Sequence, residues 1–400
     1  MRCIACGGEL FDSPLLYLDS MPASAQNIPD GEAVKTDKGV SLSLCQCRKC
    51  GLVQFDCEPV DYYRDVIRAG GFSTTMVNLR REQYQHLINT YRLEGGKFIE
   101  VGCGRGEFLS VLKEFPVKAY GIEHRKDLAA IAREQGLNVT EGFTETEETV
   151  IPGAPFDCFL SFNFLEHQPY PNTMLQAIYN NLTEEGMGLI TVPGLEYILE
   201  HDGYYELIRD HIAYYTFDTL ERLMEKNGFS VLEKEIINRD TLSMIVKKRP
   251  VGNINVAVNS KGESWGKEIL PLDVSDLKKS RDRITKEVND LIDSLQKEGK
   301  RLAIWGAGHQ GFTLAATTRL GERVSYIIDS APFKQGRFAP ASHIKIVSPD
   351  YWREEPVEAI LIVAPGYTDE IAGIIRETLI KENGDRPEIL TLKSNHLERM

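Results

Sequence analysis

At residues 97–109 the sequence is KFIEVGCGRGEFL, an apolar stretch that runs into three closely spaced glycines and then into a helical pattern over Glu107–Phe115. A second apolar stretch, Lys118–Glu123, ends in an acid seventeen residues after Gly106. This order is typical of a nucleotide-binding βαβ unit, because glycines let a ligand approach the backbone at a helix N-terminus. The segments that follow predict a doubly wound α/β sheet, with a strand at Phe156–Phe162, a helix at Met174–Leu182 and a strand at Gly186–Val192.

The glycine loop has the spacing Gly102-x-Gly104-x-Gly106, which differs from the G-x-G-x-x-G of dinucleotide folds. Glu100 can accept a hydrogen bond from a cationic amino-acid head group, and Glu123 can bind both hydroxyls of a ribose. The segment NFLEH at residues 163–167 follows a later predicted strand. Together these features resemble the class I S-adenosylmethionine-dependent methyltransferases. The resemblance implies a cofactor site built from Glu100, Gly102, Gly104, Gly106, Glu123, Asn163, Leu165 and His167.

A second core is predicted near the C-terminus. Residues 301–311 again form a strand and a glycine loop, here with the literal G-x-G-x-x-G spacing, and Val324–Asp329 is again a strand that ends in an acid. Dinucleotide binding, and with it an NAD-type oxidoreductase, is therefore an alternative. The loop APFKQGRFAP at residues 331–340 is unusual for dinucleotide folds. We therefore predict a Rossmann-like domain without its own cofactor.

The segments between these cores predict the domain organisation. Residues 61–93 carry a helical pattern that leads into the first core, and residues 249–270 have the composition of a linker. Residues 272–300 predict a long amphipathic helix whose apolar stripe packs against a core, formed by Leu277, Ile284, Val288, Leu291, Ile292 and Leu295. The predicted domains are an N-terminal module at 1–60, the first core at 61–250, a connection at 251–300 and the second core at 301–400.

Six of the eight cysteines lie before Asp61, which does not match the disulfide framework of a secreted fold. Two CxxC pairs, each followed by glycine, suit a tetrahedral zinc site with the ligands Cys3, Cys6, Cys47 and Cys50. A redox pair or free thiols are the alternatives, and Cys45 and Cys57 are left over. Because four cysteines leave no open position for a substrate, we expect the zinc to be structural and the module to be zinc-ribbon-like.

Composition limits the partners. The chain has 400 residues, of which 26% are charged, and a formal net charge of −13. Because this average field repels polyanions, neither nucleic acid nor a membrane surface is expected as a partner. The apolar runs are shorter than the roughly 20 residues of a membrane span, and the N-terminus has no signal-peptide pattern. We expect a cytoplasmic protein, a monomer or weak oligomer, that acts on a small molecule.

The order of parts extends the resemblance to the whole chain. The chain begins with CIAC at 3–6, MPASAQN at 21–27 and CQCRKCGLVQ at 45–54, and later carries WGAGHQG at 305–311 and DSAPFKQG at 329–336. This organisation resembles the nucleotide-sugar C-methyltransferases of deoxysugar pathways. The resemblance implies that a thymidine-diphosphate 4-keto sugar lies between the middle and last domains and is methylated on the ring carbon beside the ketone. It also implies substrate contacts from Gly306, Gly308, His309, Lys334 and Gln335.

Carbon methylation beside a ketone needs a base for the α-proton and a donor for the enolate oxygen. The segment RDHIAYYTF at 209–217 matches the family's Glu-His-x-x-Tyr-Phe-Ser segment, in which the histidine is the proposed base. The resemblance therefore names His211 as the base, with Asp210 orienting its ring and Tyr214 donating to the enolate. His167 is instead expected to shape the cofactor pocket.

Two departures from the family pattern leave the acceptor open. The family usually has a tyrosine three residues before its base, where this chain has Ile208, and a tyrosine-rich stretch before the first core, where this chain has Phe72. Another sugar, another nucleotide, a non-sugar acceptor and O-methylation stay as alternatives. The dinucleotide oxidoreductase is the alternative from another class of enzyme. A non-catalytic scaffold with a vestigial cofactor site is a further alternative, although the intact glycine loop, Glu100 and Glu123 argue against it.

Overall fold

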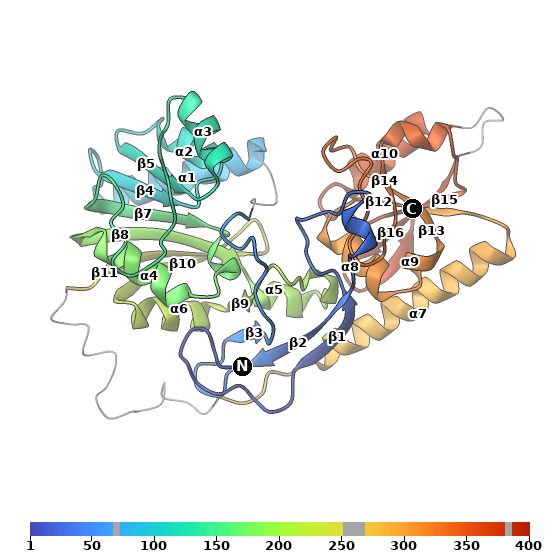
Figure 1. The fold of residues 1–400 in the computed structure, drawn as a ribbon, viewed down its shortest axis with the longest axis horizontal. Coiled ribbons are helices and arrows are strands. Elements are labelled where there is room, and N and C mark those ends of the chain that lie inside the picture. Colours follow the sequence, from blue (N-terminus) through green and yellow to red (C-terminus); the bar gives the residue numbers. More distant parts are fainter. Residues whose placement is uncertain (67–72, 251–268, 381–385) are drawn as a thin grey trace.

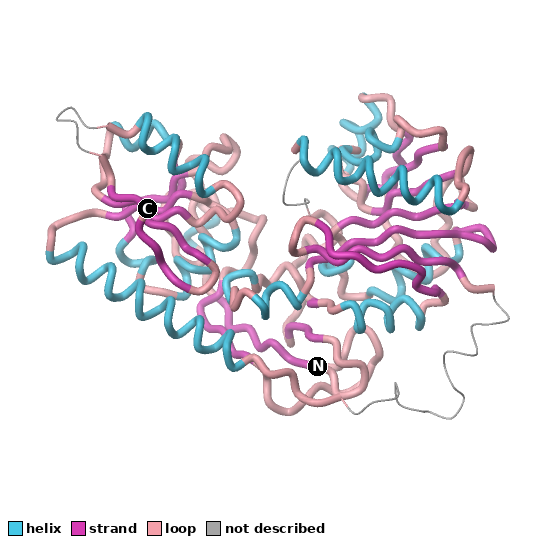
Figure 2. Tube along the Cα trace, turned by 180° about the vertical axis from the view of Figure 1, so that it is seen from behind, coloured by secondary structure: helices cyan, strands magenta, loops and turns pink. Residues whose placement is uncertain are grey.

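The computed structural model describes residues 1–66, 73–250, 269–380 and 386–400. Two α/β bodies lie side by side, and the N-terminal module lies below and between them (Figures 1 and 2). Most of the predicted linker, residues 251–268, and the departure at Phe72 fall outside the described residues.

The first body is built on a seven-stranded sheet with the order β10-β11-β8-β7-β4-β5-β6. The strands β4 to β8 run parallel, and β10 and β11 add an antiparallel hairpin at one edge. The predicted α/β sheet is therefore present. Its strands are β4 (Lys97–Val101), β5 (Lys118–Glu123), β6 (Asn138–Glu141), β7 (Phe156–Phe162), β8 (Leu182–Pro193), β10 (Phe229–Ile237) and β11 (Thr241–Lys248).

Two of these strands, β5 and β7, have the bounds that the sequence predicts, and other elements differ. The helix α2 (Glu107–Leu112) ends before the predicted Phe115, because Pro116 disfavours helical backbone at the residue before it. The helix α4 (Pro171–Asn180) begins and ends earlier than predicted, since Pro171 favours the first helical position, and β8 accordingly starts at Leu182.

Helices cover both faces of this sheet (Figure 1). On one face lie α1 (Thr74–Tyr91), α2 and α3 (Lys126–Glu134), and toward the other lie α4, α5 (Leu195–Glu200) and α6 (Phe217–Lys226). The helical pattern over 61–93 is only partly correct, because α1 begins after Ser73, whose side chain accepts a hydrogen bond from the Met76 N–H at 3.2 Å. Residues 61–66 form turns instead.

The N-terminal module contributes three strands of a four-stranded sheet: β1 (Leu16–Met21), β2 (Val40–Gln46) and β3 (Val53–Phe55). The fourth strand, β9 (Ala213–Tyr214), comes from the first core and pairs with β3. The module is thus completed by the segment that follows His211.

The second body carries a six-stranded sheet with the order β14-β13-β12-β15-β16-β17, in which only β17 is antiparallel to its neighbour. Its strands are β12 (Leu302–Trp305), β13 (Val324–Ile328), β14 (Ile346–Val347), β15 (Ala359–Ile362), β16 (Glu388–Lys393) and β17 (His396–Arg399). Its helices are α8 (His309–Thr317), α9 (Leu320–Arg323) and α10 (Thr368–Thr378). The long helix α7 (Ser275–Lys297) packs on β17 and α9, and all six predicted stripe residues are buried.

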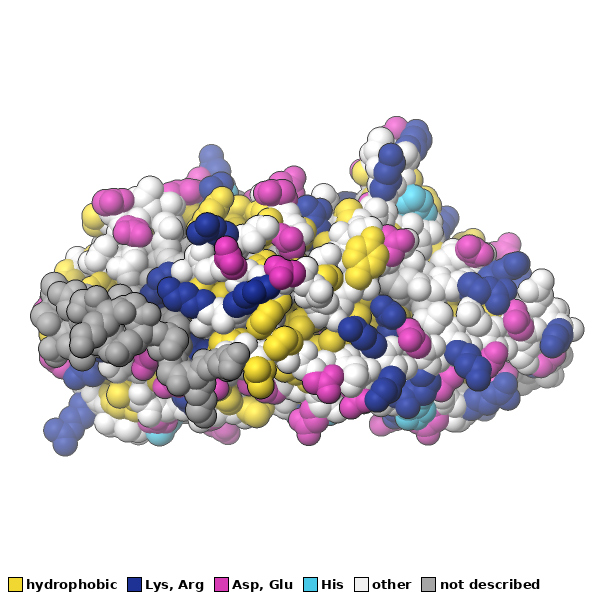
Figure 3. Space-filling view, turned by 90° about the horizontal axis from the view of Figure 1, so that it is seen from below, with side chains coloured by type: hydrophobic (Ala, Val, Ile, Leu, Met, Phe, Trp, Pro, Cys, Tyr) yellow, Lys and Arg dark blue, Asp and Glu magenta, His cyan; other side chains and the backbone are white. Residues whose placement is uncertain are grey.

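Side-chain contacts join the three parts. Glu206, in the first core, accepts hydrogen bonds from His309 at 3.0 Å and Gln310 at 2.5 Å at the start of α8. Asp37 of the N-terminal module lies 2.9 Å from His343 Nε2 in the second body. On the face in Figure 3, basic and acidic side chains are interspersed. Within the described residues, every helix is too short or too polar to cross a membrane.

Candidate active site

The glycine loop and Glu123 lie together at the predicted nucleotide end of the site. Gly104 has a left-handed backbone (φ +59), and its N–H donates to Glu123 Oε2 at 2.8 Å. The other carboxylate oxygen accepts from the Arg125 N–H at 2.8 Å. The φ of +82 at Gly106 favours glycine, and a Cβ there would also force the Leu137 side chain, whose Cδ1 would lie at 2.1 Å, to shift. The loop and the acid are therefore brought together, as the sequence predicts for a ribose-binding edge.

The remaining predicted cofactor residues lie at the ends of the neighbouring strands. Glu100 is fully buried in β4. Asn163 follows β7 with a left-handed backbone (φ +47), and its side-chain oxygen accepts from the Thr191 hydroxyl at 2.9 Å. Leu165 belongs to the hydrophobic core. Residues 165–167 form a buried 3₁₀ turn at the carboxyl edge of the sheet, where ligands bind in folds of this kind.

His167 and His211 form a contact pair beside this turn. Their ring centroids are 4.7 Å apart with nearly perpendicular planes, and their nitrogens lie within 4.8 Å of a Glu166 carboxylate oxygen. His167 Nδ1 donates to the Asp210 carbonyl at 2.8 Å, which leaves Nε2 as the acceptor in the neutral ring. Burial lowers the pKa of His167 to about 4. Burial also lowers the pKa of His211 well below its usual value, and His167 and His309 add to this effect.

Asp210 and Tyr214 have partners that the sequence did not predict. The Asp210 carboxylate accepts from the Tyr62 hydroxyl at 2.5 Å and from the Ala25 N–H at 2.8 Å. The Tyr214 hydroxyl donates to the Ile208 carbonyl at 3.1 Å and accepts from the Ile208 N–H at 2.8 Å. Both side chains thus hold the backbone around His211.

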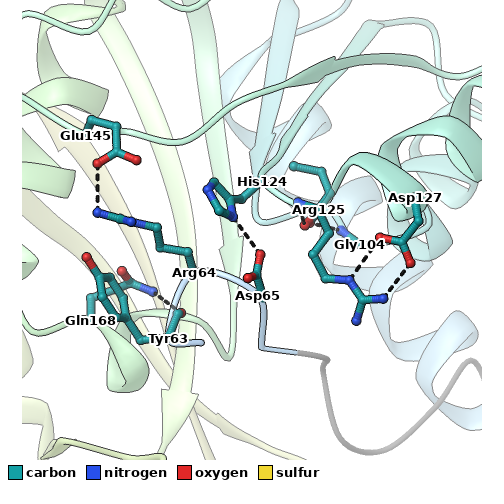
Figure 4. A network of polar contacts seen from close by, with 10 residues as sticks. Tyr63, Arg64, Asp65, Gly104, His124, Arg125, Asp127, Glu145 and Gln168 are labelled. Atoms are coloured by element: carbon teal, nitrogen blue, oxygen red, sulfur yellow. Dashed lines mark hydrogen bonds and ion pairs between the residues drawn. The ribbon is translucent and has the colours of Figure 1, made fainter. Parts of the chain in front are cut away.

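Sequence reasoning missed a group of residues that covers the nucleotide end (Figure 4). Asp65 lies 2.6 Å from His124, the residue after Glu123, and Arg64 lies 3.0 Å from Glu145. Gln168 donates to the Tyr63 carbonyl at 3.4 Å. The sequence pattern at 61–93 predicts a helix that includes the charged residues at 61–65, and no local signal marks their distant partners.

In the second body, the predicted substrate residues fall into two groups. Lys334 Nζ donates to Asp329 Oδ2 at 3.0 Å and to the Ala307 carbonyl at 2.9 Å, and Gln335 donates to the Asp329 carbonyl at 3.0 Å. These side chains hold their own loop. Gly306 and Gly308 lie in the loop between β12 and α8, and His309 begins α8 and faces the first core through Glu206.

The four predicted metal ligands converge in the N-terminal module. Their sulfur atoms lie within 4.8 Å of one another, with Cys3–Cys50 at 3.5 Å and Cys6–Cys47 at 3.4 Å. Zn–S bonds of about 2.3 Å in a tetrahedron place sulfur atoms about 3.8 Å apart, so the donor set fits zinc. Backbone N–H groups of Gly8 and Lys49 point at the sulfurs of Cys6 and Cys47, as the knuckle geometry requires.

Comparison with known proteins agrees with this geometry. Residues 76–234 match the family described as "Methyltransferase domain", and residues 273–385 match "C-methyltransferase C-terminal domain". The C-methyltransferase NovU of Streptomyces niveus is 22% identical over 400 residues, which cover 96% of this chain and 94% of that protein. A ubiquinone biosynthesis O-methyltransferase of Nitrosococcus oceani is 30% identical over 98 residues, which cover 23% of this chain and 42% of the relative.

Among solved structures, an S-adenosylmethionine-dependent methyltransferase from Clostridium acetobutylicum is 13% identical with a TM-score of 0.36, covering 43% of this chain and 92% of that one. The class of enzyme is defined by the family match of residues 76–234, together with the parallel sheet and the glycine loop that contacts Glu123. The chain is an S-adenosylmethionine-dependent methyltransferase. The match of residues 273–385 and the similarity to NovU over 96% of this chain further support a C-methyltransferase.

Proposed function

We propose that this enzyme methylates a ring carbon beside the ketone of a nucleoside-diphosphate sugar, and that His211 removes the α-proton. The observation that carries the proposal is the contact pair of neutral imidazoles, the buried His167 and the partly buried His211, at the carboxyl edge of the first sheet. A general base must be unprotonated before it can act, and both rings meet this condition at neutral pH. Bound S-adenosylmethionine supplies the electrophilic methyl group.

The surrounding residues would position this base. The Asp210 carbonyl fixes the His167 tautomer, and Tyr214 closes the turn from Ile208 to His211 through its two hydrogen bonds. At the cofactor, Glu123 would bind the ribose and the buried Glu100 would accept from the amino group of the methionine part.

The acceptor is proposed to lie between the first core and α8. His309 contacts Glu206 of the first core and contributes to the electrostatics of His211, so the two bodies meet close to the base. A Cβ at Gly308 would meet no neighbouring atom within 4 Å, so the start of α8 is open to a ligand there. A nucleoside diphosphate bound at this joint would present its sugar to His211.

The experiment is incubation with S-adenosylmethionine and a thymidine-diphosphate 4-keto sugar in deuterated water. We expect a product that is one CH₂ heavier, with the new methyl attached to carbon by NMR, and exchange of the α-hydrogen for deuterium. A methyl attached to oxygen, without exchange, would support the O-methyltransferase alternative. No transfer to any keto sugar would reject the proposed acceptor class.

We also propose that Cys3, Cys6, Cys47 and Cys50 hold one structural zinc ion. The sulfur spacing and the N–H groups directed at sulfur support this ligand set. Elemental analysis of protein purified without chelator should find one zinc per chain, and a Cys47→Ser, Cys50→Ser variant should lose it. Protein without zinc that keeps its fold would reject the assignment.

A further inference from the structure

Residues 61–66, here called the strap, connect the N-terminal module to the segment before α1. The strap forms turns, with a hydrogen bond from the Asp65 N–H to the Tyr62 carbonyl at 2.7 Å. Its side chains extend to two different places in the molecule.

One end of the strap contacts the cofactor edge (Figure 4). Asp65 pairs with His124, which directly follows β5 and Glu123, and Arg64 pairs with Glu145, which lies in the loop after β6. The Arg64 guanidinium also lies 5.6 Å from the ring centroid of Phe143 in the same loop. These loops follow the carboxyl ends of parallel strands, which is where a nucleotide binds in a doubly wound sheet.

The other end of the strap contacts the segment that carries His211. The Tyr62 hydroxyl donates to Asp210 Oδ1 at 2.5 Å, and Asp210 is only 1% exposed. Burial raises the pKa of Asp210, and the hydrogen bond from Tyr62 opposes this rise. The main-chain carbonyl of Asp210 accepts from His167, and His211 is the next residue.

The contacts at the two ends of the strap differ in strength. The Asp65–His124 and Arg64–Glu145 pairs have side chains that are 35–49% exposed, and ion pairs at such positions contribute only about 0.2–1 kcal/mol each. Contacts this weak can be strengthened or broken by a ligand that binds against the same loops. The hydrogen bond from Tyr62 to the buried carboxylate is the firmer anchor.

We propose that the strap couples cofactor binding to the position of His211. Cofactor bound against Glu123 and His124 stabilises the closed strap, and Tyr62 then holds Asp210 and the turn before His211 in place. In this proposal, Asp65 increases the affinity for the cofactor. Tyr62 is a positioning residue that acts on His211 through Asp210. The cofactor end depends only on the methyltransferase class, whereas the consequence for catalysis rests on the proposed role of His211.

The test needs no acceptor, so it stays decisive if the proposed sugar or the proposed base is wrong. S-adenosylhomocysteine is titrated by calorimetry, and amide hydrogen exchange is followed with and without it in residues 62–66 and at the His211 N–H, which donates to the Ile208 carbonyl at 3.1 Å. In the unmodified protein, the ligand should slow exchange at both places.

Asp65→Asn should weaken S-adenosylhomocysteine binding by about two- to fivefold and reduce the ligand-induced protection of the strap. The matched control is Glu233→Gln, which removes a similar carboxylate–histidine contact with His86 at 2.8 Å, in a pair formed by α1 and β10. The control should bind like the unmodified protein. Equal affinity in Asp65→Asn and the control would overturn the cofactor end of the proposal.

Tyr62→Phe should keep ligand affinity and strap protection within about twofold of the unmodified protein, yet lose the ligand-induced protection of the His211 N–H. Its control is Tyr91→Phe, which removes a hydroxyl–carboxylate hydrogen bond of the same 2.5 Å length, to Glu233. This comparison separates coupling from a general loss of stability. Ligand-induced protection at His211 that persists in Tyr62→Phe as in Tyr91→Phe would overturn the coupling.

Discussion

The two glycine loops of this chain follow buried strands in the same way, and each meets a carboxylate from the next strand. In the first core, Glu123 accepts from the N–H groups of Gly104 and Arg125 at 2.8 Å. In the second body, Asp329 accepts from the N–H groups of Ala307 at 3.0 Å and Ala331 at 2.9 Å. The difference is Lys334, whose ammonium lies 3.0 Å from Asp329 and takes up acceptor capacity that a ribose would need.

The glycines of the two loops also differ in the space around their Cα atoms. A Cβ at Gly306 would lie 2.4 Å from the Val363 carbonyl oxygen, and one at Gly311 would lie 2.4 Å from the Gly306 carbonyl oxygen. At Gly104 the nearest atom is the carboxylate of Glu107 at 3.1 Å, the end of a flexible side chain. Close backbone packing thus explains two glycines of the literal G-x-G-x-x-G spacing, Gly306 and Gly311, whereas a Cβ at Gly308 would meet no atom within 4 Å. A glycine motif alone does not indicate a dinucleotide.

The largest expected effect tests whether the chemistry belongs to the edge of the first core. His211→Asn keeps a similar shape but cannot accept the α-proton, so turnover should fall by about 10²–10⁴-fold. Calorimetry should show unchanged S-adenosylmethionine binding. Solvent exchange of the acceptor α-hydrogen at an undiminished rate in this variant would remove His211 from the mechanism.

The next effect is the pH dependence of stability that the first core should confer. The pKa of His167 is lowered to about 4 in the folded protein, whereas an unfolded histidine has a pKa of about 6.5. The unfolded chain therefore binds a proton that the folded chain does not, and about 3 kcal/mol of stability should be lost as the pH falls from 6.5 to 4. Denaturant unfolding at pH 7 and 5 should record about 2 kcal/mol of this loss in the unmodified protein and less in His167→Gln, and an identical loss in both would contradict the prediction.

A direct test of the comparison uses the two carboxylates. If Glu123 binds the ribose as proposed, Glu123→Ala removes two charge-assisted hydrogen bonds to it and should weaken S-adenosylmethionine binding about tenfold or more. Asp329→Ala should leave this affinity unchanged, and NAD should show no binding to either variant or to the unmodified protein by calorimetry. Equal losses of S-adenosylmethionine affinity would mean that the two cores are coupled or that the cofactor site is misassigned.

The smallest effect concerns Lys334. Lys334→Met removes a partner of Asp329 within a pair whose side chains are 21% and 13% exposed, so the free energy of unfolding should fall by about 1–2 kcal/mol. S-adenosylhomocysteine affinity should not change. Lys334→Met, Asp329→Asn should recover part of the loss, because the uncompensated charge is then absent. If urea unfolding of Lys334→Met showed no decrease in the free energy of unfolding, the ion pair would not contribute to stability.

Local patterns made part of this structure predictable. The strands β5 and β7, the buried stripe of α7 and the convergence of four cysteines follow from hydrophobic periodicity and CxxC spacing. The partners of Asp210 were not predictable in the same way. Its place before His211 suggests that it orients the ring, yet its carboxylate bonds Tyr62, 148 residues away. Such pairings depend on how distant loops meet, and the spacing along the chain carries no information on them.

The pairing of β3 with β9 has a consequence for attempts to exchange parts between related enzymes. Val53 pairs with Tyr214 and Gln54 with Ala213, so the cysteine-bearing module supplies the strand that braces the segment after His211. A chimera that replaces residues 1–60 therefore also replaces the neighbour of the candidate base. Exchange at that boundary should alter catalysis even when the cofactor and acceptor loops are retained, and grafts should carry residues 207–215 together with the module.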